Sequence, residues 1–290
     1  MMFDGFSRAR VDAHGTSINV VHGGSGPPVL LLHGYPQSHV MWHRVAPMLA
    51  ANHTVVCPDL RGYGDSAKPS PDDQPEGYAK RTLARDQVEV MHQLGFDRFA
   101  LVGHDRGARV ARRLSLDHPG RVSRLAVLDI VPTHAVYANL DQARATTVWR
   151  YFFLIQPTGL PEHLIGADPV FYLHATLREW TRTPNAFTPE ALAEYERCFD
   201  RATIEASCAD YRAGATIDLD HDRADAARRI ACPVLVLWSA TGIGADYDVP
   251  EIWRQQADDV RGHPIDCGHF LAEERPDEVT SRLAAFLAVE

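Results

Sequence analysis

An aspartate stands at the centre of a glycine-flanked turn in the stretch LVGHDRGARVARRL. Asp105 lies between Gly103 and Gly107, after an apolar run and before a helical pattern. A G-x-S-x-G turn in this context presents a nucleophilic serine over the edge of a sheet. A carboxylate in that place is already anionic, and a helix N-terminus favours its charge, so it can attack saturated carbon without a base. A helix cap would also suit aspartate, but it would not explain both glycines. The pattern predicts Asp105 as a nucleophile that forms an alkyl ester.

Such an ester needs a base that activates water, and the base needs an acidic partner. His269 lies in PIDCGHF, after a probable last strand and 21 residues before the end of the sequence. Its position after Asp105 and near the C-terminus fits a hydrolase base. Asp129 ends the apolar run LAVLD and is the predicted partner. After the other candidate run, VLVLW, the chain reads SATGIG, and Asp246 and Asp248 come only later.

The turn HGYPQ follows another apolar run. Ester hydrolysis passes through an oxyanion, which backbone N–H groups can stabilise. The backbone N–H groups of Tyr35 and Arg106 are the predicted donors.

Two arginines follow the aspartate three residues apart. Arg106 and Arg109 would share one face of the helix that begins at the turn. Arginine binds carboxylates through two parallel hydrogen bonds, so the pair predicts a small anionic organic substrate, in contrast to a solvated salt-bridge pair. We expect Arg112 and Arg113, further along the helix, to lie on the surface.

These residues must be positioned by the ends of neighbouring strands. Short apolar runs bounded by turn residues alternate with helical patterns, which predicts an α/β protein with a mostly parallel, doubly wound sheet. The expected strands lie at 27–34, 53–60, 98–105, 123–130 and 231–238, and a helix is expected at 81–95. Parallel strands bring their carboxyl ends, and therefore the predicted site residues, to one edge of the sheet.

The middle of the chain is different: it is helical and aromatic and contains no apolar run typical of a buried strand. We therefore predict an α/β core at 1–133, a helical cap (lid) inserted at 134–222, and the rest of the core at 223–290.

Composition limits the remaining possibilities. The chain has 290 residues, of which 45% are hydrophobic, and a net charge of −9, which does not suit nucleic-acid binding. No apolar run approaches the ~20 residues of a membrane span, and the beginning lacks the apolar core of a secretory signal. The odd number of cysteines, without a C-x-x-C pair, predicts reduced thiols in a cytoplasmic protein. The five cysteines stand at 57, 198, 208, 232 and 267.

Taken together, the residues closely resemble the fluoroacetate and haloacetate dehalogenases of the α/β-hydrolase superfamily. The resemblance covers nearly the whole chain, through HGYPQSHVMWHRVAP, DLRGYGDS, GHDRGARV, LAVLDIVPT, DYRAGA and GHF. GHDRGARV is the most specific of these, because related epoxide hydrolases and haloalkane dehalogenases usually have Trp after the aspartate. The resemblance implies an α/β-hydrolase fold and is compatible with a homodimer, whose interface the sequence does not identify. The mechanism expected from the residues needs no cofactor and no metal.

The resemblance also implies roles for individual residues. Asp105 is the nucleophile, His269 the base and Asp129 its acid, while Arg106 and Arg109 hold the substrate carboxylate. The lid residues Trp180 and Tyr211 match family residues that line the halide end of the pocket.

One departure from the family bears on the halogen. Fluoride-handling members carry adjacent His and Trp seven and six residues before a Gln-Pro proline. Counted back from Pro157, this sequence has Arg150 and Tyr151 there. Both residues are assigned to the leaving-group pocket. Since chloride and bromide need less hydrogen-bonding help to leave than fluoride, we predict a hydrolase of small 2-haloacids that prefers chloro and bromo substrates.

Two other functions remain open. An epoxide hydrolase would use the same nucleophile and base, with lid tyrosines as acids. Tyr211 suits that role, whereas Tyr151 is displaced by one position, about 100° around a helix. A non-catalytic binder of small ligands on the same scaffold is the other alternative. Metal catalysis has little support, because His39 and His43 in HVMWH lack the glutamate of a zinc-binding H-E-x-x-H.

Overall fold

The apolar runs found in the sequence form the centre of the sheet. The computed structural model describes residues 2–71 and 76–288. In these residues one eight-stranded sheet has the order β1-β2-β4-β3-β5-β6-β7-β8. The predicted strands are β3 (Pro28–Leu32), β4 (Thr54–Pro58), β5 (Phe99–His104), β6 (Val122–Leu128) and β7 (Val234–Ser239). They pair in parallel, as does the last strand, β8 (Val260–Ile265). The predicted α/β fold is confirmed.

Two strands at the start of the chain were not expected. β1 (Ser7–Ala13) and β2 (Thr16–Gly23) form an antiparallel hairpin, and β2 also pairs antiparallel with β4. β1 lies at the edge of the sheet and is largely exposed, so it has no continuous apolar run. Edge strands of this kind give a weak sequence signal.

Helices cover the sheet on both sides. α2 (Lys80–Gln93), which confirms the predicted helix, packs on α3 (Asp105–Asp117), and α1 (Ala46–Leu49) packs on α15 (Pro276–Leu287). Gly95 ends α2 with a left-handed φ of 86°. The remaining short helices of the core are η1 (His39–Trp42), α12 (Ile243–Asp246), α13 (Val249–Arg254) and α14 (Leu271–Glu274).

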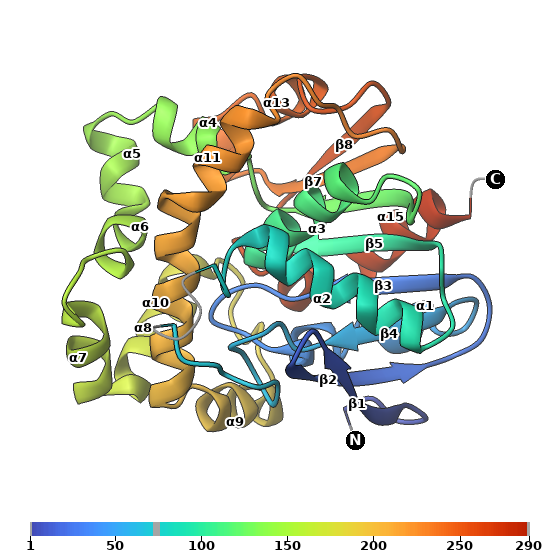
Figure 1. Ribbon diagram of the computed structural model, residues 1–290, viewed down its shortest axis with the longest axis horizontal. Coiled ribbons are helices and arrows are strands. Elements are labelled where there is room, and N and C mark those ends of the chain that lie inside the picture. The colour runs from blue at the N-terminus through green and yellow to red at the C-terminus, as the bar shows by residue number, and fades with distance from the viewer. Residues whose placement is uncertain (1, 72–75, 289–290) are drawn as a thin grey trace.

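The chain between β6 and β7 is entirely helical. It forms α4 (Thr133–Ala138), α5 (Gln142–Thr147), α6 (Trp149–Leu154), α7 (Leu160–Ala167), α8 (Pro169–Trp180), α9 (Pro189–Cys198), α10 (Arg201–Ala215) and α11 (Ile217–Ala224). Figure 1 shows most of these helices stacked at one end of the sheet, to the left of the strands. We call this segment, residues 133–224, the cap.

Two further expectations concern the cysteines and the membrane. All five cysteines are free thiols. No helix in the described ranges is long and apolar enough to cross a bilayer.

Candidate active site

The turn after β5 holds Asp105 in a backbone conformation that side chains rarely adopt. Asp105 has a φ of +43° and begins α3. A Cβ on Gly107 would lie 2.3 Å from the carbonyl oxygen of His33, so only glycine fits between the turn and β3. The turn therefore projects the Asp105 carboxylate over the sheet edge at a helix N-terminus. The backbone N–H of Tyr35 donates to Asp105 Oδ2 at 3.0 Å.

Asp129, directly after β6, and His269, in the segment after β8, form a hydrogen-bonded pair. His269 Nδ1 lies 2.6 Å from Asp129 Oδ2. The other carboxylate oxygen of Asp129 accepts the backbone N–H of Ser239, at the end of β7, at 2.7 Å. His269 Nε2 is buried and has no hydrogen-bond partner among the described residues. The Asp129 contact fixes the ring so that Nε2 is the nitrogen left to accept a proton.

Charges around the pair set the protonation states. Burial alone would lower the pKa of His269, but the hydrogen bond and charge of Asp129 and the charge of Asp105 raise it above its ordinary value. Burial would raise the pKa of Asp105, and the charges of His269 and Arg109 together hold it below its ordinary value. His104 packs against the His269 ring, and burial and that neighbour lower its pKa to about 3, so it stays neutral. The Asp105 carboxylate is thus anionic.

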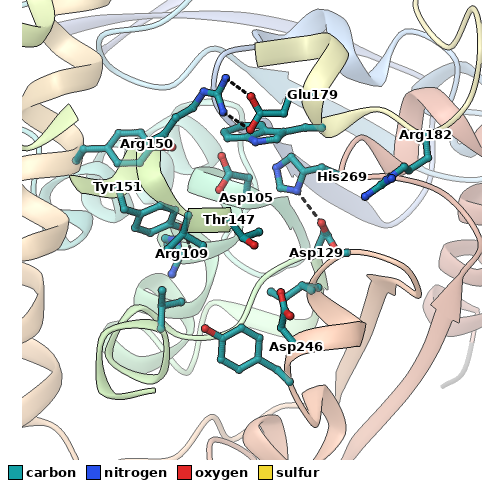
Figure 2. Close-up of a pocket in the computed structure, with 18 residues that line it drawn as sticks. Asp105, Arg109, Asp129, Thr147, Arg150, Tyr151, Glu179, Arg182, Asp246 and His269 are labelled. Atoms are coloured by element: carbon teal, nitrogen blue, oxygen red, sulfur yellow. Dashed lines mark hydrogen bonds and ion pairs between the residues drawn. The ribbon is translucent and has the colours of Figure 1, made fainter. Parts of the chain in front are cut away.

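One cavity of about 370 Å³ joins these groups under the cap. Figure 2 shows Asp105, His269 and Asp129 on its wall, with Arg109 and Tyr151 close together and Arg150 joined to Glu179. Eight of the predicted site residues line it: Asp105, Arg109, Asp129, Arg150, Tyr151, Trp180, Tyr211 and His269. Its remaining wall includes apolar side chains from the cap and from the segment after β7: Val136, Val148, Ile243 and Tyr247.

Arg109 is the arginine of the predicted pair that lines the cavity. Its Nη1 donates to Thr133 Oγ1 at 2.7 Å and to the Val131 carbonyl at 3.1 Å, and its Nη2 donates to the Tyr151 hydroxyl at 2.6 Å. The Nε of Arg109 has no partner within the described residues. Arg109 therefore brings a positive charge to the wall on which Asp105 lies.

Arg106 has a different environment. Its guanidinium is buried and donates from Nε to Asp210 Oδ2 at 2.6 Å and from Nη2 to the Asp210 carbonyl at 2.7 Å. It also stacks on the Tyr211 ring. Asp210 lies on α10 of the cap, and Lys80 contacts its other carboxylate oxygen. Arg106 is not among the cavity-lining residues, so in this structure its guanidinium joins the core to the cap.

The backbone of Arg106 was predicted to contribute to the oxyanion hole. Its N–H lies in the first turn of α3, where N–H groups have no acceptor within the helix. The expectation that Arg113 lies on the surface is wrong: its side chain is buried and pairs with Asp117 and Asp225. Arg112 is half-buried and donates to Asp222.

Arg150 forms a two-pronged ion pair with Glu179. Nη1 and Nη2 donate to the two carboxylate oxygens at 2.8 and 2.9 Å, and Nε donates to Thr176 at 3.2 Å. Its guanidinium also lies over the rings of Trp149 and Trp180. The charge of Arg150 is therefore compensated at the cavity wall.

Two neutral hydrogen-bond donors also line this cavity, the indole N–H of Trp180 and the hydroxyl of Tyr211. The Tyr151 and Tyr211 rings meet edge to face with centroids 5.5 Å apart. This part of the cavity wall thus offers neutral donors.

Comparisons with known proteins agree with this geometry. Residues 27–276 match the family model of the alpha/beta hydrolase fold. The chain is 45% identical to a fluoroacetate dehalogenase from Burkholderia sp over 290 residues, which cover 99% of this chain and 95% of that protein. It is 34% identical to a soluble epoxide hydrolase from Corynebacterium sp. (strain C12), with 95% of each chain covered.

The crystal structure of ALR0039 from Nostoc sp PCC 7120 superposes with a TM-score of 0.97 at 56% identity, over 99% of both chains. The chain is an α/β hydrolase of the haloacetate dehalogenase family. The resemblance inferred from the sequence is confirmed.

Sequence reasoning missed several residues that hold this hydrolase's site together. Glu179 directly precedes Trp180, and Asp210 directly precedes Tyr211, so each lies beside a predicted residue but carries no motif of its own. Their roles depend on arginines 29 and 104 residues away along the chain. Ser239 contributes only its backbone to Asp129, which any residue could do.

We expect the His269–Asp129 pair to set the pH dependence of turnover. The base must be neutral, and a raised pKa means that neutral His269 is lost as the pH falls through a value above the ordinary 6.5. Asp129→Asn removes the charge that raises the pKa, so it should shift the acid limb of kcat to lower pH and lower the plateau by about 10²- to 10⁴-fold.

The measurement is a kcat–pH profile for each variant. The control is Asp248→Asn, because Asp248 caps α13 and does not line the cavity. An acid limb that does not move in Asp129→Asn would contradict the assignment.

Proposed function

We propose that this enzyme removes halide from 2-haloacids by hydrolysis, through an ester on Asp105. The observation that supports it most is the presence on one cavity wall of a carboxylate anion, a histidine with Nε2 unengaged, and the cation of Arg109. Two carboxylates repel, so a substrate anion reaches Asp105 only where a cation offsets that repulsion. Arg109 meets this requirement.

In the first step the substrate carboxylate binds Arg109. An oxygen of Asp105 attacks the α-carbon from the side opposite the halogen, a carbon–oxygen bond forms, and the carbon–halogen bond breaks. The halide leaves with the bonding electron pair towards the N–H of Trp180 and the hydroxyl of Tyr211. A covalent ester joins Asp105 to the acid.

In the second step His269 Nε2 takes a proton from water, and the resulting hydroxide attacks the ester carbonyl of Asp105. The backbone N–H groups of Tyr35 and Arg106 stabilise the oxyanion. On collapse, the alcohol oxygen of the product takes the proton from His269. Asp105 returns to its carboxylate, losing a proton to solvent, and the products are a 2-hydroxyacid and halide.

The leaving-group end supports chloro and bromo substrates over fluoro ones. Fluoride is the poorest leaving group of the three and needs the strongest hydrogen bonding. The guanidinium of Arg150 already donates to Glu179 and Thr176. Trp180 and Tyr211 supply only neutral donors.

The size of the cavity supports substrates beyond haloacetates. A volume of about 370 Å³ lies in the range of pockets that hold ligands much larger than a haloacetate. Val136, Val148 and Ile243 offer an apolar wall to an alkyl chain on the α-carbon. We therefore propose 2-haloalkanoic acids as the substrate class.

Epoxide hydrolysis is the second candidate. Tyr151 and Tyr211 both line the cavity with their rings in contact, and Arg109 donates to the Tyr151 hydroxyl, leaving its proton for an epoxide oxygen. Although Tyr151 is displaced by one position in the sequence, its hydroxyl can therefore still act together with that of Tyr211 in the cavity.

The deciding measurement is product formation from fluoroacetate, chloroacetate, bromoacetate, 2-bromobutanoate and styrene oxide. We expect halide from the chloro and bromo acids, more slowly from fluoroacetate, and turnover of 2-bromobutanoate at least equal to that of bromoacetate. Diol from styrene oxide without halide from any acid would overturn the proposal in favour of epoxide hydrolysis.

Replacement of Arg109 tests the substrate anion. Arg109→Ala should raise KM for bromoacetate by about 10- to 100-fold, which corresponds to the loss of charge-assisted hydrogen bonds. KM for its neutral methyl ester should change much less. Arg112→Ala, on the same helix but outside this cavity, is the control. Equal effects of Arg109→Ala on acid and ester would exclude a carboxylate contact.

Replacement of the base tests the ester. His269→Ala leaves Asp105 able to attack but removes the group that activates water. Intact-protein and peptide mass spectrometry after incubation with bromoacetate should therefore show one added carboxymethyl group, on the peptide containing Asp105. A variant that releases halide without any adduct would argue against covalent catalysis.

A further inference from the structure

Glu274 is a buried carboxylate that the mechanism above does not use. It ends α14, five residues after His269, and is only 5% exposed. Its two oxygens accept four backbone N–H groups. Oε2 accepts those of Arg182 at 3.0 Å, Thr183 at 2.9 Å and Gly268 at 2.9 Å, and Oε1 accepts that of Phe270 at 3.1 Å.

These four donors come from two separate parts of the molecule. Gly268 and Phe270 are the immediate neighbours of His269 in the core, whereas Arg182 and Thr183 follow α8 in the cap. A fifth hydrogen bond joins the same segments, from the backbone N–H of His269 to the Trp180 carbonyl at 2.8 Å. Glu274 therefore ties the backbone on both sides of the base to the cap.

The two segments are in close contact. A Cβ on Gly268 would lie 2.4 Å from the Trp180 carbonyl oxygen and 2.7 Å from Arg182 N. The rings of Trp180 and His269 also meet edge to face, with centroids 5.1 Å apart. Small changes in this contact would therefore move the His269 ring.

A buried carboxylate is costly unless its hydrogen bonds are satisfied. Among the described residues, no Lys, Arg or His forms an ion pair with Glu274, so backbone N–H groups alone satisfy it. Its charge also contributes to raising the pKa of His269. Glutamine in the same place has an NH₂ group instead of one carboxylate oxygen. That NH₂ group would face a backbone N–H group, so glutamine could not accept all four of these hydrogen bonds.

We propose that Glu274 is a positioning residue for ester hydrolysis. It fixes the His269 backbone against the cap, so that Nε2 is held where it can activate the water that attacks the ester on Asp105. The idea rests on the proposed ester mechanism. Asp105 itself is placed by its own turn and by Tyr35, so the first step does not depend on Glu274 in this way.

The test is Glu274→Gln, with the two steps measured separately. Displacement of a catalytic group by about 1 Å can slow a step about 10²-fold. With bromoacetate, we expect ester hydrolysis to slow by about 10- to 100-fold and ester formation by less than about 3-fold. Halide should then appear as a burst equal to the enzyme concentration, and the ester should accumulate on Asp105.

The adjacent glutamate provides a matched control. Burial raises the pKa of Glu273 to about 8, so this carboxyl is already protonated near neutral pH and Gln resembles it closely. Glu273→Gln should show no burst. The acid limb of kcat should move to lower pH in Glu274→Gln only, which a loss of stability alone would not cause.

Amide hydrogen exchange gives a readout that does not require activity. The amides of Arg182, Thr183, Gly268 and Phe270 should lose protection in Glu274→Gln and keep it in Glu273→Gln. Unchanged protection, or equal slowing of both chemical steps, would overturn the positioning role.

Failure of the proposed function has a different signature. If the unaltered enzyme releases no halide from any haloacid, the dehalogenase proposal fails. Amide hydrogen exchange still tests whether Glu274 joins the backbone around His269 to the cap. A burst of styrene oxide consumption equal to the enzyme concentration is then sought, because His269 would also hydrolyse an ester formed from an epoxide. The absence of a burst with the substrate that is turned over would overturn the role of Glu274.

Discussion

The site depends on keeping a buried carboxylate ionised. Asp105 is nearly inaccessible to water, and burial alone would favour its neutral form, which cannot attack carbon. Three features oppose this: the N-terminus of α3, the N–H of Tyr35, and the positive charges of His269 and Arg109. They come from the ends of β5, β3 and β8, which must therefore reach the same point. A parallel sheet with its crossovers supplies such a convergence, and the glycines at the turn after β5 allow the close approach.

The arginines near the cavity have two different roles: two of them hold the cap in place, and one leaves its charge facing the cavity. Arg106 and Arg150 each meet a cap carboxylate, Asp210 and Glu179, and are compensated there. Both pairs hold the cap, one to the core and one between its own helices α6 and α8. Among the described residues, the hydrogen bonds of Arg109 go to neutral oxygens, so its charge is left for the cavity. The partner of an arginine, more than its position in a motif, decides whether it can bind a substrate anion.

Much of this could be predicted from the sequence, because strands and turns leave local signals. The central strands, the turn around Asp105 and the His269–Asp129 pair all follow from apolar runs and from residue order. The environment of Arg106 could not be predicted, since Asp210 comes from the cap, 104 residues away. The contacts of Glu274 could not be predicted either. Its carboxylate accepts backbone N–H groups, which every residue except proline has, so the sequence of its partners carries no signal. Arg113 was misjudged because a helix pattern alone does not show that Asp117 and Asp225 enclose it.

The choice between a haloacid and an epoxide is then decided at Arg109. Its Nη2 donates to the Tyr151 hydroxyl, so in this structure one group serves both chemistries. A substrate carboxylate is a stronger acceptor than a phenol and would compete for that N–H. When the carboxylate displaces it, the Tyr151 hydroxyl is released beside Tyr211, at the proposed leaving-group end of the cavity. A neutral epoxide cannot make that exchange and would meet Tyr151 with its oxygen still bound to Arg109, so that the phenolic hydrogen is left to donate to the epoxide oxygen. The same pair of residues would thus favour binding of the acid and ring opening of the epoxide by different routes.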